Sequence, residues 1–145
     1  MDVRVWGVVE DRLIELRVEA ATSGVGIRVD GLPENRKRTT ADRVRAALVN
    51  SGLVREAPPV AIRLEPPVRT GTTSGLDLAV ALAVLAQAGG LGSGLGWILA
   101  TGRLGLDGTV HAPGLADRPT LADVVGSLCQ TPMLGFEHMF ETGRR

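Results

Sequence analysis

The sequence predicts an α+β fold, in which a mixed or antiparallel sheet carries helices packed on one face. Three segments, 14–20, 25–30 and 60–65, alternate apolar and polar residues with the period of two that is typical of half-solvated strands. Two others, 40–51 and 76–88, have the apolar content and spacing of helices. With 145 residues the chain is long enough to bury a single core without a disulfide bond.

The first two strands are predicted to form a hairpin. Residues 3–9 are rich in valine, and the dipeptide Glu10-Asp11 follows them as a turn. In the next segment Ile14 and Leu16 alternate with charged residues, so one face of this strand is expected to lie in the core and the other in water.

The first helix is expected to follow a Gly-Leu-Pro turn at 31–33 and to run from Thr40 to Ser51. Thr39 or Thr40 is expected to cap its start, and Gly52 is expected to end it in the left-handed conformation. Its core-facing residues are predicted to be Val44, Ala47, Leu48 and Ser51.

The second helix is predicted to begin at Ser74, whose S-x-x-D relation to Asp77 resembles a capping box. Its body, 76–88, is apolar on every side apart from Asp77 and Gln87. A helix with this composition is expected to be buried.

A second hairpin is predicted near residue 104. A strand over 98–104 leads to Asp107-Gly108, which is typical of a type I′ turn, and the chain returns through 109–111. Asp107 is therefore interpreted as a turn residue, and His111, near the end of the strand, as a hydrogen-bonded structural histidine.

The last predicted element is a short helix over 120–128, with Pro119 at its start. The tail has no clear period and is expected to be loosely ordered. The sequence thus predicts one domain over residues 1–128 and a C-terminal tail over 129–145.

Composition argues against several classes of protein. Sixteen basic residues balance sixteen acidic ones, so no overall field favours nucleic acid or anionic lipid. The start of the chain lacks the apolar run of a signal peptide, and the longest apolar run, 78–86, is shorter than the ~20 residues that span a bilayer. We therefore expect a cytoplasmic protein with no membrane contact.

Metal and cofactor sites are not expected. Cys129 is the only cysteine, and it does not combine with His111 and His138 into the spacing of zinc ligands. Asp77 and Asp107 have simpler roles at a helix start and a turn, which argues against a magnesium site.

Several strings of residues carry a family resemblance when they are taken together. They are DRLIELRVEA, DGLPENRKRTTADRVRAALVNSG, SGLDLAVALAVLAQAGG and GRLGLDGTV. Over residues 5–113 the chain resembles the N-terminal domain of the magnesium-chelatase-like ATPases, the group that includes the competence-associated DNA helicases. The resemblance implies the α+β fold that is shared with one ribosomal protein domain and with the peptidase domain of Lon-type proteases.

The sequence departs from this family in two places. In the family, further βα units follow the second hairpin, whereas here LADVVGSL at 121–128 comes almost at once. The domain is therefore expected to be shortened after about residue 115, with a sheet edge left uncovered. The ATPase module that would come next in the family is replaced by residues 133–145, and no stretch fits the P-loop pattern G-x-x-x-x-G-K-[ST].

One segment resembles the nucleophile turn of Lon-type peptidases. In residues 69–75, RTGTTSG, either Thr73 or Ser74 lies at the entrance to a buried helix. A hydroxyl needs a base, such as the lysine that follows in that family, but Lys37 is the only lysine and Ala116 lies near the corresponding position. The turn is therefore interpreted as degenerate, Ser74 as a helix cap, and no catalytic residue is expected.

A basic cluster is the candidate for nucleic-acid or partner binding. Its members are Arg36, Lys37, Arg38, Arg43 and Arg45. Contacts from these residues to phosphates would give salt-dependent binding that ignores base sequence. The simpler interpretation is a solvated charged face of the helix, because no aromatic residues are interspersed for base stacking.

The favoured function is a non-catalytic protein-interaction or assembly module derived from a magnesium-chelatase-like ATPase. Its expected partner is a second copy of the chain or another protein, such as a separate AAA ATPase; no small-molecule substrate or cofactor is evident. The alternatives are an accessory nucleic-acid-binding module of a DNA-processing ATPase, a degenerate Lon-like peptidase domain, or a remnant without a role.

Overall fold

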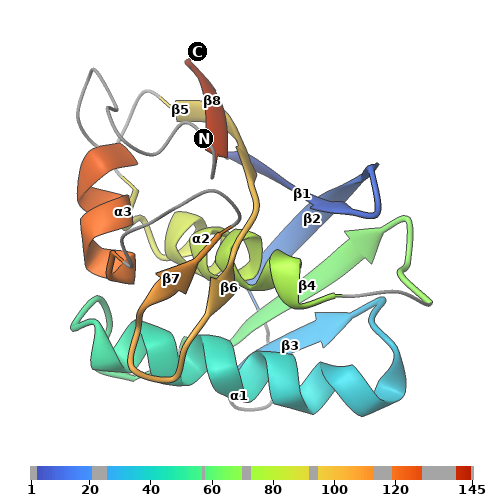
Figure 1. Ribbon diagram of the computed structural model, residues 1–145, viewed down its shortest axis with the longest axis horizontal. Helices are drawn as coiled ribbons and strands as arrows, with labels where there is room; N and C mark the ends of the chain where they lie inside the picture. Colours follow the sequence, from blue (N-terminus) through green and yellow to red (C-terminus); the bar gives the residue numbers. More distant parts are fainter. Residues whose placement is uncertain are drawn as a thin grey trace.

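The computed structural model describes residues 3–20, 26–56, 58–69, 73–91, 95–112, 119–128 and 140–144. Its strands are β1 Arg4–Val9, β2 Arg12–Ala20, β3 Ile27–Asp30, β4 Val60–Glu65, β5 Leu95–Ala100, β6 Arg103–Leu104, β7 Val110–His111 and β8 Phe140–Arg144. Its helices are α1 Glu34–Asn50, the 3₁₀ turn η1 Ser74–Leu76, α2 Asp77–Gln87 and α3 Leu121–Leu128. The predicted α+β class is confirmed (Figure 1).

One mixed sheet holds most of the described strands, in the order β3-β4-β2-β1-β5-β8, and β6 pairs with β7 separately. The predicted hairpin of β1 and β2 is confirmed, with Val5 opposite Leu16. Glu10 and Asp11 both have positive φ, at 49° and 65°, which suits the type I′ turns of tight hairpins. β1 and β5 run parallel, as do β3 and β4.

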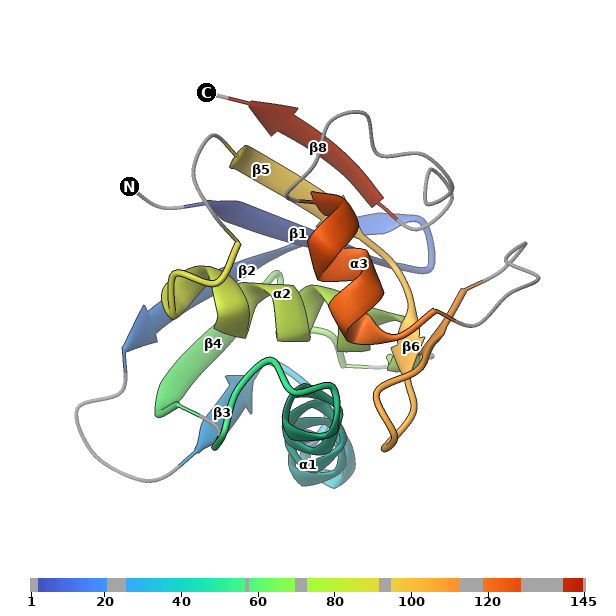
Figure 2. The same ribbon diagram turned by 90° about the vertical axis from the view of Figure 1, so that its left-hand side faces the viewer.

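The helices cover one face of the sheet. Figures 1 and 2 show α2 between the sheet and α3, with α1 alongside. All residues of α2 from Asp77 to Leu85 are buried, as the apolar sequence predicts. The strands contribute the residues on the covered side of their alternation, among them Val5, Ile14, Leu16, Ile62, Leu64 and Ile98. The opposite face of the sheet has no described helix on it.

α1 begins six residues earlier than expected. Pro33 precedes its first residue, Glu34, and has a φ of −55° that suits the entry to a helix. Thr40, the expected cap, is instead buried within the helix. The predicted end is confirmed: Gly52 has a φ of 75°, and its N–H binds the Val49 carbonyl oxygen at 3.0 Å.

The predicted capping box at Ser74 is wrong. Ser74 begins η1, and no side chain caps either η1 or α2. A capping box occurs instead at α3, where the Asp123 N–H donates to Thr120 Oγ1 and the Thr120 N–H donates to Asp123 Oδ2, both at 3.1 Å.

The predicted strand over 98–104 is interrupted. β5 ends at Ala100, and Gly102 then bonds to the start of α2: its N–H binds the Gly75 carbonyl oxygen, and its own carbonyl accepts the Leu78 N–H, both at 3.0 Å. The predicted type I′ turn is also wrong. Only Gly108 of the expected pair has positive φ, and its N–H binds the Gly105 carbonyl oxygen, so the turn is wider.

The end of the chain differs from the expected loose tail. β8 pairs antiparallel with β5, with Phe140 opposite Ala100. The shortened domain was expected to leave a sheet edge uncovered, and β8 covers the edge of β5. Residues 129–139 lie outside the described part of the chain. Among the described residues, no helix combines the length and apolar content that crossing a membrane requires.

Candidate interaction site

Apolar side chains gather on the face of the sheet that the helices leave uncovered. Leu13 is 56% exposed and Trp97 is 38% exposed, and both alternate with buried neighbours in their strands. Trp6, Val8 and Leu99 lie on the same side and are partly exposed. We call this group the open-face patch; it consists of Trp6, Val8, Leu13, Trp97 and Leu99.

The strand register makes the open-face patch contiguous. Val8 lies opposite Leu13, and Trp6 lies opposite Leu99. Because Arg4 lies opposite Trp97, Trp6 and Trp97 are diagonal neighbours across β1 and β5. Diagonal pairs lie about 7–8 Å apart at their backbones, which is within reach of aromatic side chains. Both tryptophans of the chain therefore belong to one surface.

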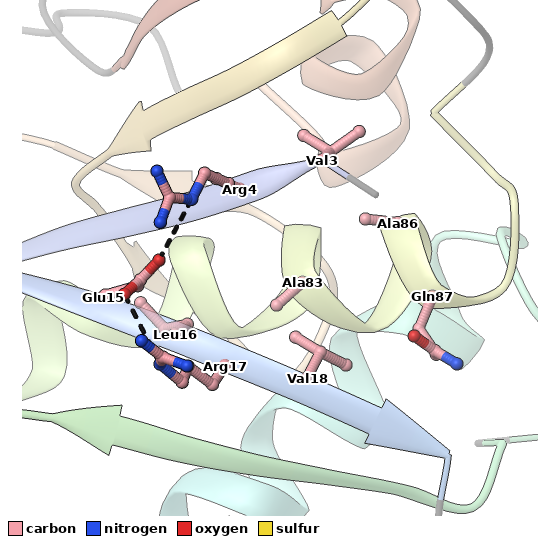
Figure 3. Close-up of a pocket in the computed structure, with 9 residues that line it drawn as sticks. All are labelled: Val3, Arg4, Glu15, Leu16, Arg17, Val18, Ala83, Ala86 and Gln87. Carbon is pink, nitrogen blue, oxygen red and sulfur yellow. Dashed lines mark ion pairs between the residues drawn. The ribbon is translucent and has the colours of Figure 1, made fainter. Parts of the chain in front are cut away.

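A row of alternating charges crosses the sheet beside the patch, and Figure 3 shows three of its members, Arg4, Glu15 and Arg17. Glu15 lies between Arg4 and Arg17, with its carboxylate oxygens 3.4 Å and 3.5 Å from their Nε atoms. Arg17 also pairs with Glu65 at 2.8 Å, and Glu65 pairs with Arg63 at 3.0 Å. The signs therefore alternate across β1, β2 and β4, and we call these five residues the charge row.

A slot opens where β1 and β2 separate. The pairing of β1 and β2 ends at Val5 and Leu16, while β2 continues to Ala20 alongside β4. The resulting cavity, of about 270 Å³, reaches through the sheet to Ala83 and Gln87 of α2 (Figure 3). Arg4, Glu15 and Arg17 also line this cavity.

A buried ion pair joins α1 and α2, and a backbone bond ties it to β6. Arg43 Nε and Nη2 donate to the two oxygens of Asp77 at 2.7 Å and 2.9 Å, and the Leu104 N–H donates to Asp77 at 3.0 Å. Asp77 is fully buried. Burial raises the pKa of Asp77 above its ordinary value, although the bonds from Arg43 and Leu104 oppose this effect. The bond to Asp77 raises the pKa of Arg43.

The sequence prediction missed this role of Asp77, which it interpreted as a helix-start residue. The available signal was a single acidic residue in a helix that is otherwise apolar along the buried length. A buried carboxylate requires a cationic or hydrogen-bonding partner, but α1 offers several arginines and the sequence alone does not show which one lies nearest.

The predicted basic cluster does not form one surface. Successive α-helical residues are about 100° apart, so Arg36 and Arg43 lie on one side of α1 and Arg38 and Arg45 on the opposite side. Arg43 is committed to Asp77. The remaining members are more exposed: Lys37 pairs with Glu34 at 2.9 Å, Arg38 lies 3.9 Å from Asp42, and Arg36 and Arg45 lie exposed on α1.

The two hydroxyls of the degenerate nucleophile turn differ in their surroundings. Thr73 is 2% exposed, whereas Ser74 is partly exposed at the first position of η1. The sole lysine, Lys37, lines a hollow with Pro33 and Arg69 and bonds to Glu34. The rest of the turn, residues 70–72, lies outside the described part of the chain.

Two polar residues of the second hairpin have the structural roles that the sequence predicts for them. Asp107 Oδ1 accepts bonds from the Thr109 N–H at 3.1 Å and from Thr109 Oγ1 at 2.7 Å, which confirms it as a turn residue. His111 Nε2 lies 3.1 Å from Thr109 Oγ1, which confirms a hydrogen-bonded histidine. In the described segments, no three His, Cys, Asp or Glu side chains come together as metal ligands.

Comparison with known proteins finds one family. The family model described as subunit ChlI of Mg-chelatase matches residues 14–116. The matched range begins in β2, ends after β7 and contains α1, α2 and Asp77. No curated protein matches the chain.

Proposed function

Because the chain belongs to the family of subunit ChlI of Mg-chelatase, we propose that it is a non-catalytic assembly module of this family. Its working surface is the open-face patch together with the charge row. Catalysis receives no support from the sequence, since no P-loop pattern is present and the sole lysine, Lys37, bonds to Glu34.

The observation that carries this proposal is the pair of tryptophans on an uncovered sheet face. Exposed apolar groups that form a contiguous patch with a polar border are typical of protein–protein contacts. Tryptophan is enriched in such contacts and often contributes most of their binding energy. The open-face patch has this arrangement, because Trp6 and Trp97 lie beside the ionised side chains of Arg4 and Glu15.

The occupant that fits this surface is a second copy of the chain. The charge row presents three arginines and two glutamates in alternation, so a copy related by a two-fold axis can place arginines against glutamates. The chain has equal numbers of acidic and basic residues, so two copies meet without net repulsion.

Light scattering across a range of protein concentrations tests this proposal. The wild-type mass should rise toward that of a dimer, and Leu13→Arg should weaken association about tenfold or more by placing an unpaired charge in the contact. Leu106→Arg is the matched control, because Leu106 is 63% exposed in the turn between β6 and β7, outside the patch.

The two variants should have the same circular dichroism spectrum and melting temperature, which separates association from folding. A monomer at every concentration would contradict self-assembly, even if the patch then bound a family ATPase. Equal effects of Leu13→Arg and Leu106→Arg would show that the patch is not the contact.

A further inference from the structure

At the end of the sheet opposite the slot, two hollows lie next to each other beside the segment that follows β4. The first, of about 370 Å³, is lined by Arg12 and Arg69 beside the hairpin turn of β1 and β2. The second, of about 360 Å³, is lined by Lys37 and Arg69 beside the start of α1. Both share Pro67, Val68 and Arg69, so Arg69 stands between them.

Three cations from three separate parts of the chain therefore line the two adjoining hollows, which together we call the track. Arg12 begins β2, Lys37 lies in α1, and Arg69 follows β4. Among the described residues Arg12 and Arg69 form no ion pair, and Lys37 has an exposed one with Glu34 that costs little to break. In the part of the chain that the structure describes, Glu10 is the single carboxylate that lines either hollow.

We propose that this track binds a chain of phosphates, with one phosphate in each hollow. The guanidinium group of arginine can donate two parallel hydrogen bonds to the oxygens of one phosphate, and the lysine ammonium group adds a positive point charge. One isolated anion can fill one hollow, but adjoining hollows that share Arg69 favour a ligand with repeated charges. The two sources of such a ligand are single-stranded nucleic acid and inorganic polyphosphate.

This site differs from the predicted basic cluster and from the open-face patch. Of the predicted cluster, only Lys37 lines a hollow, and Arg12 and Arg69 were not predicted. The hollows lie near Val9 and the hairpin turn, whereas the slot lies near Arg4, at the other end of β1. The failure of one proposal therefore leaves the other standing.

Fluorescence anisotropy of a dye-labelled oligothymidylate tests the site directly. Two bound phosphates, one in each hollow, predict that log K falls with log salt with a slope of about −1.4 for a single strand. Arg69→Ala should weaken binding about tenfold or more and flatten the slope by about 0.7, because Arg69 lines both hollows. Arg12→Ala and Lys37→Ala should have smaller effects.

Arg45→Ala is the matched control, because Arg45 is an exposed arginine of α1 that lines neither hollow. It should change affinity less than twofold. Unlabelled polyphosphate should displace the oligonucleotide; if polyphosphate binds and the oligonucleotide does not, the track is confirmed and polyphosphate is its source. The proposal would be overturned if Arg45→Ala and Arg69→Ala reduced the affinity equally. It would also be overturned if polyglutamate displaced the oligonucleotide as effectively as polyphosphate does, or if neither the oligonucleotide nor polyphosphate bound.

Discussion

A single carboxylate connects three elements of this molecule. Asp77 accepts two bonds from Arg43 of α1 and one from the backbone of β6, while itself beginning α2. A buried ion pair contributes little net stability compared with an apolar contact, but removing one partner leaves a charge without compensation. Arg43 therefore serves to hold α1 in place.

Replacement of Arg43 tests this anchoring role. Arg43→Met should lower the free energy of unfolding by about 3–5 kcal/mol at neutral pH, because the buried Asp77 carboxylate then loses the cation that is bonded to it. Arg43→Lys keeps the positive charge but cannot donate the same pair of hydrogen bonds to Asp77, so it should lower the free energy of unfolding by less. Urea unfolding measures both values, and wild-type stability in both variants would contradict the anchoring role.

The same variant has a defined pH dependence. Burial raises the folded pKa of Asp77, so the stability contributed by this group is full below its unfolded pKa of 3.8 and is lost as pH rises through the folded pKa. Arg43→Met removes an opposing effect and should raise that pKa further. Its stability deficit should therefore be smaller at about pH 4 than at pH 7. A deficit that does not change with pH would contradict this account of Asp77.

Two hydroxyls provide a comparison of helix caps. Thr120→Ala removes the cap of α3 and should cost about 1 kcal/mol, a typical value for a lost N-cap. Ser74→Ala removes no capping bond and should change stability by less than about 0.5 kcal/mol. Urea unfolding measures both changes in stability. A loss in Ser74→Ala as large as that in Thr120→Ala would support the predicted cap at Ser74.

At the scale of elements, the sheet and the 3₁₀ turn η1 approach closely at Gly7. A Cβ at this position would lie 2.5 Å from Leu76 Cδ2, and Leu76 is fully buried. Gly7→Ala should therefore lower the free energy of unfolding by about 1–3 kcal/mol through overpacking. Gly126→Ala in α3 is the control, because a Cβ there meets nothing within 4 Å and alanine favours the helix by about 0.5–1 kcal/mol. Thermal unfolding that ranked the two variants in the reverse order would contradict this packing.

Elements with a strong apolar period could be predicted from the sequence. The alternation in β2 and β4 and the apolar body of α2 specify both the element and its burial. The start of α1 was missed because residues 34–39 are polar and carry no period, although Pro33 can begin a helix. β8 was missed because its pairing with β5 is a contact between distant segments.

The open-face patch could not be predicted for a related reason. In β1 the residues of both faces are apolar or glycine from Val5 to Val9, so the alternation does not show which face Trp6 occupies. The two tryptophans are 91 positions apart and meet only because β1 and β5 pair in parallel. The anchoring role of Asp77 depends in the same way on tertiary contacts with α1 and β6.

At the scale of the whole molecule, the uncovered face of the sheet is the feature that calls for a partner. The helices bury the other face, β8 covers the edge of β5, and the exposed tryptophan and leucine remain on the open side. In the account proposed here, a ChlI-family domain works by docking this surface against a second copy.

The most direct test is the emission spectrum of Trp97 in a Trp6→Phe variant during dilution. The chain has two tryptophans and no tyrosine, so this variant reports a single side chain of the patch. Docking predicts that the Trp97 emission shifts to longer wavelength on dilution, as the mass measured by light scattering falls. When Leu13→Arg is combined with Trp6→Phe, the emission should lie at the longer wavelength at every concentration. An emission spectrum that stays the same at all concentrations, with the mass of a monomer, would contradict the account.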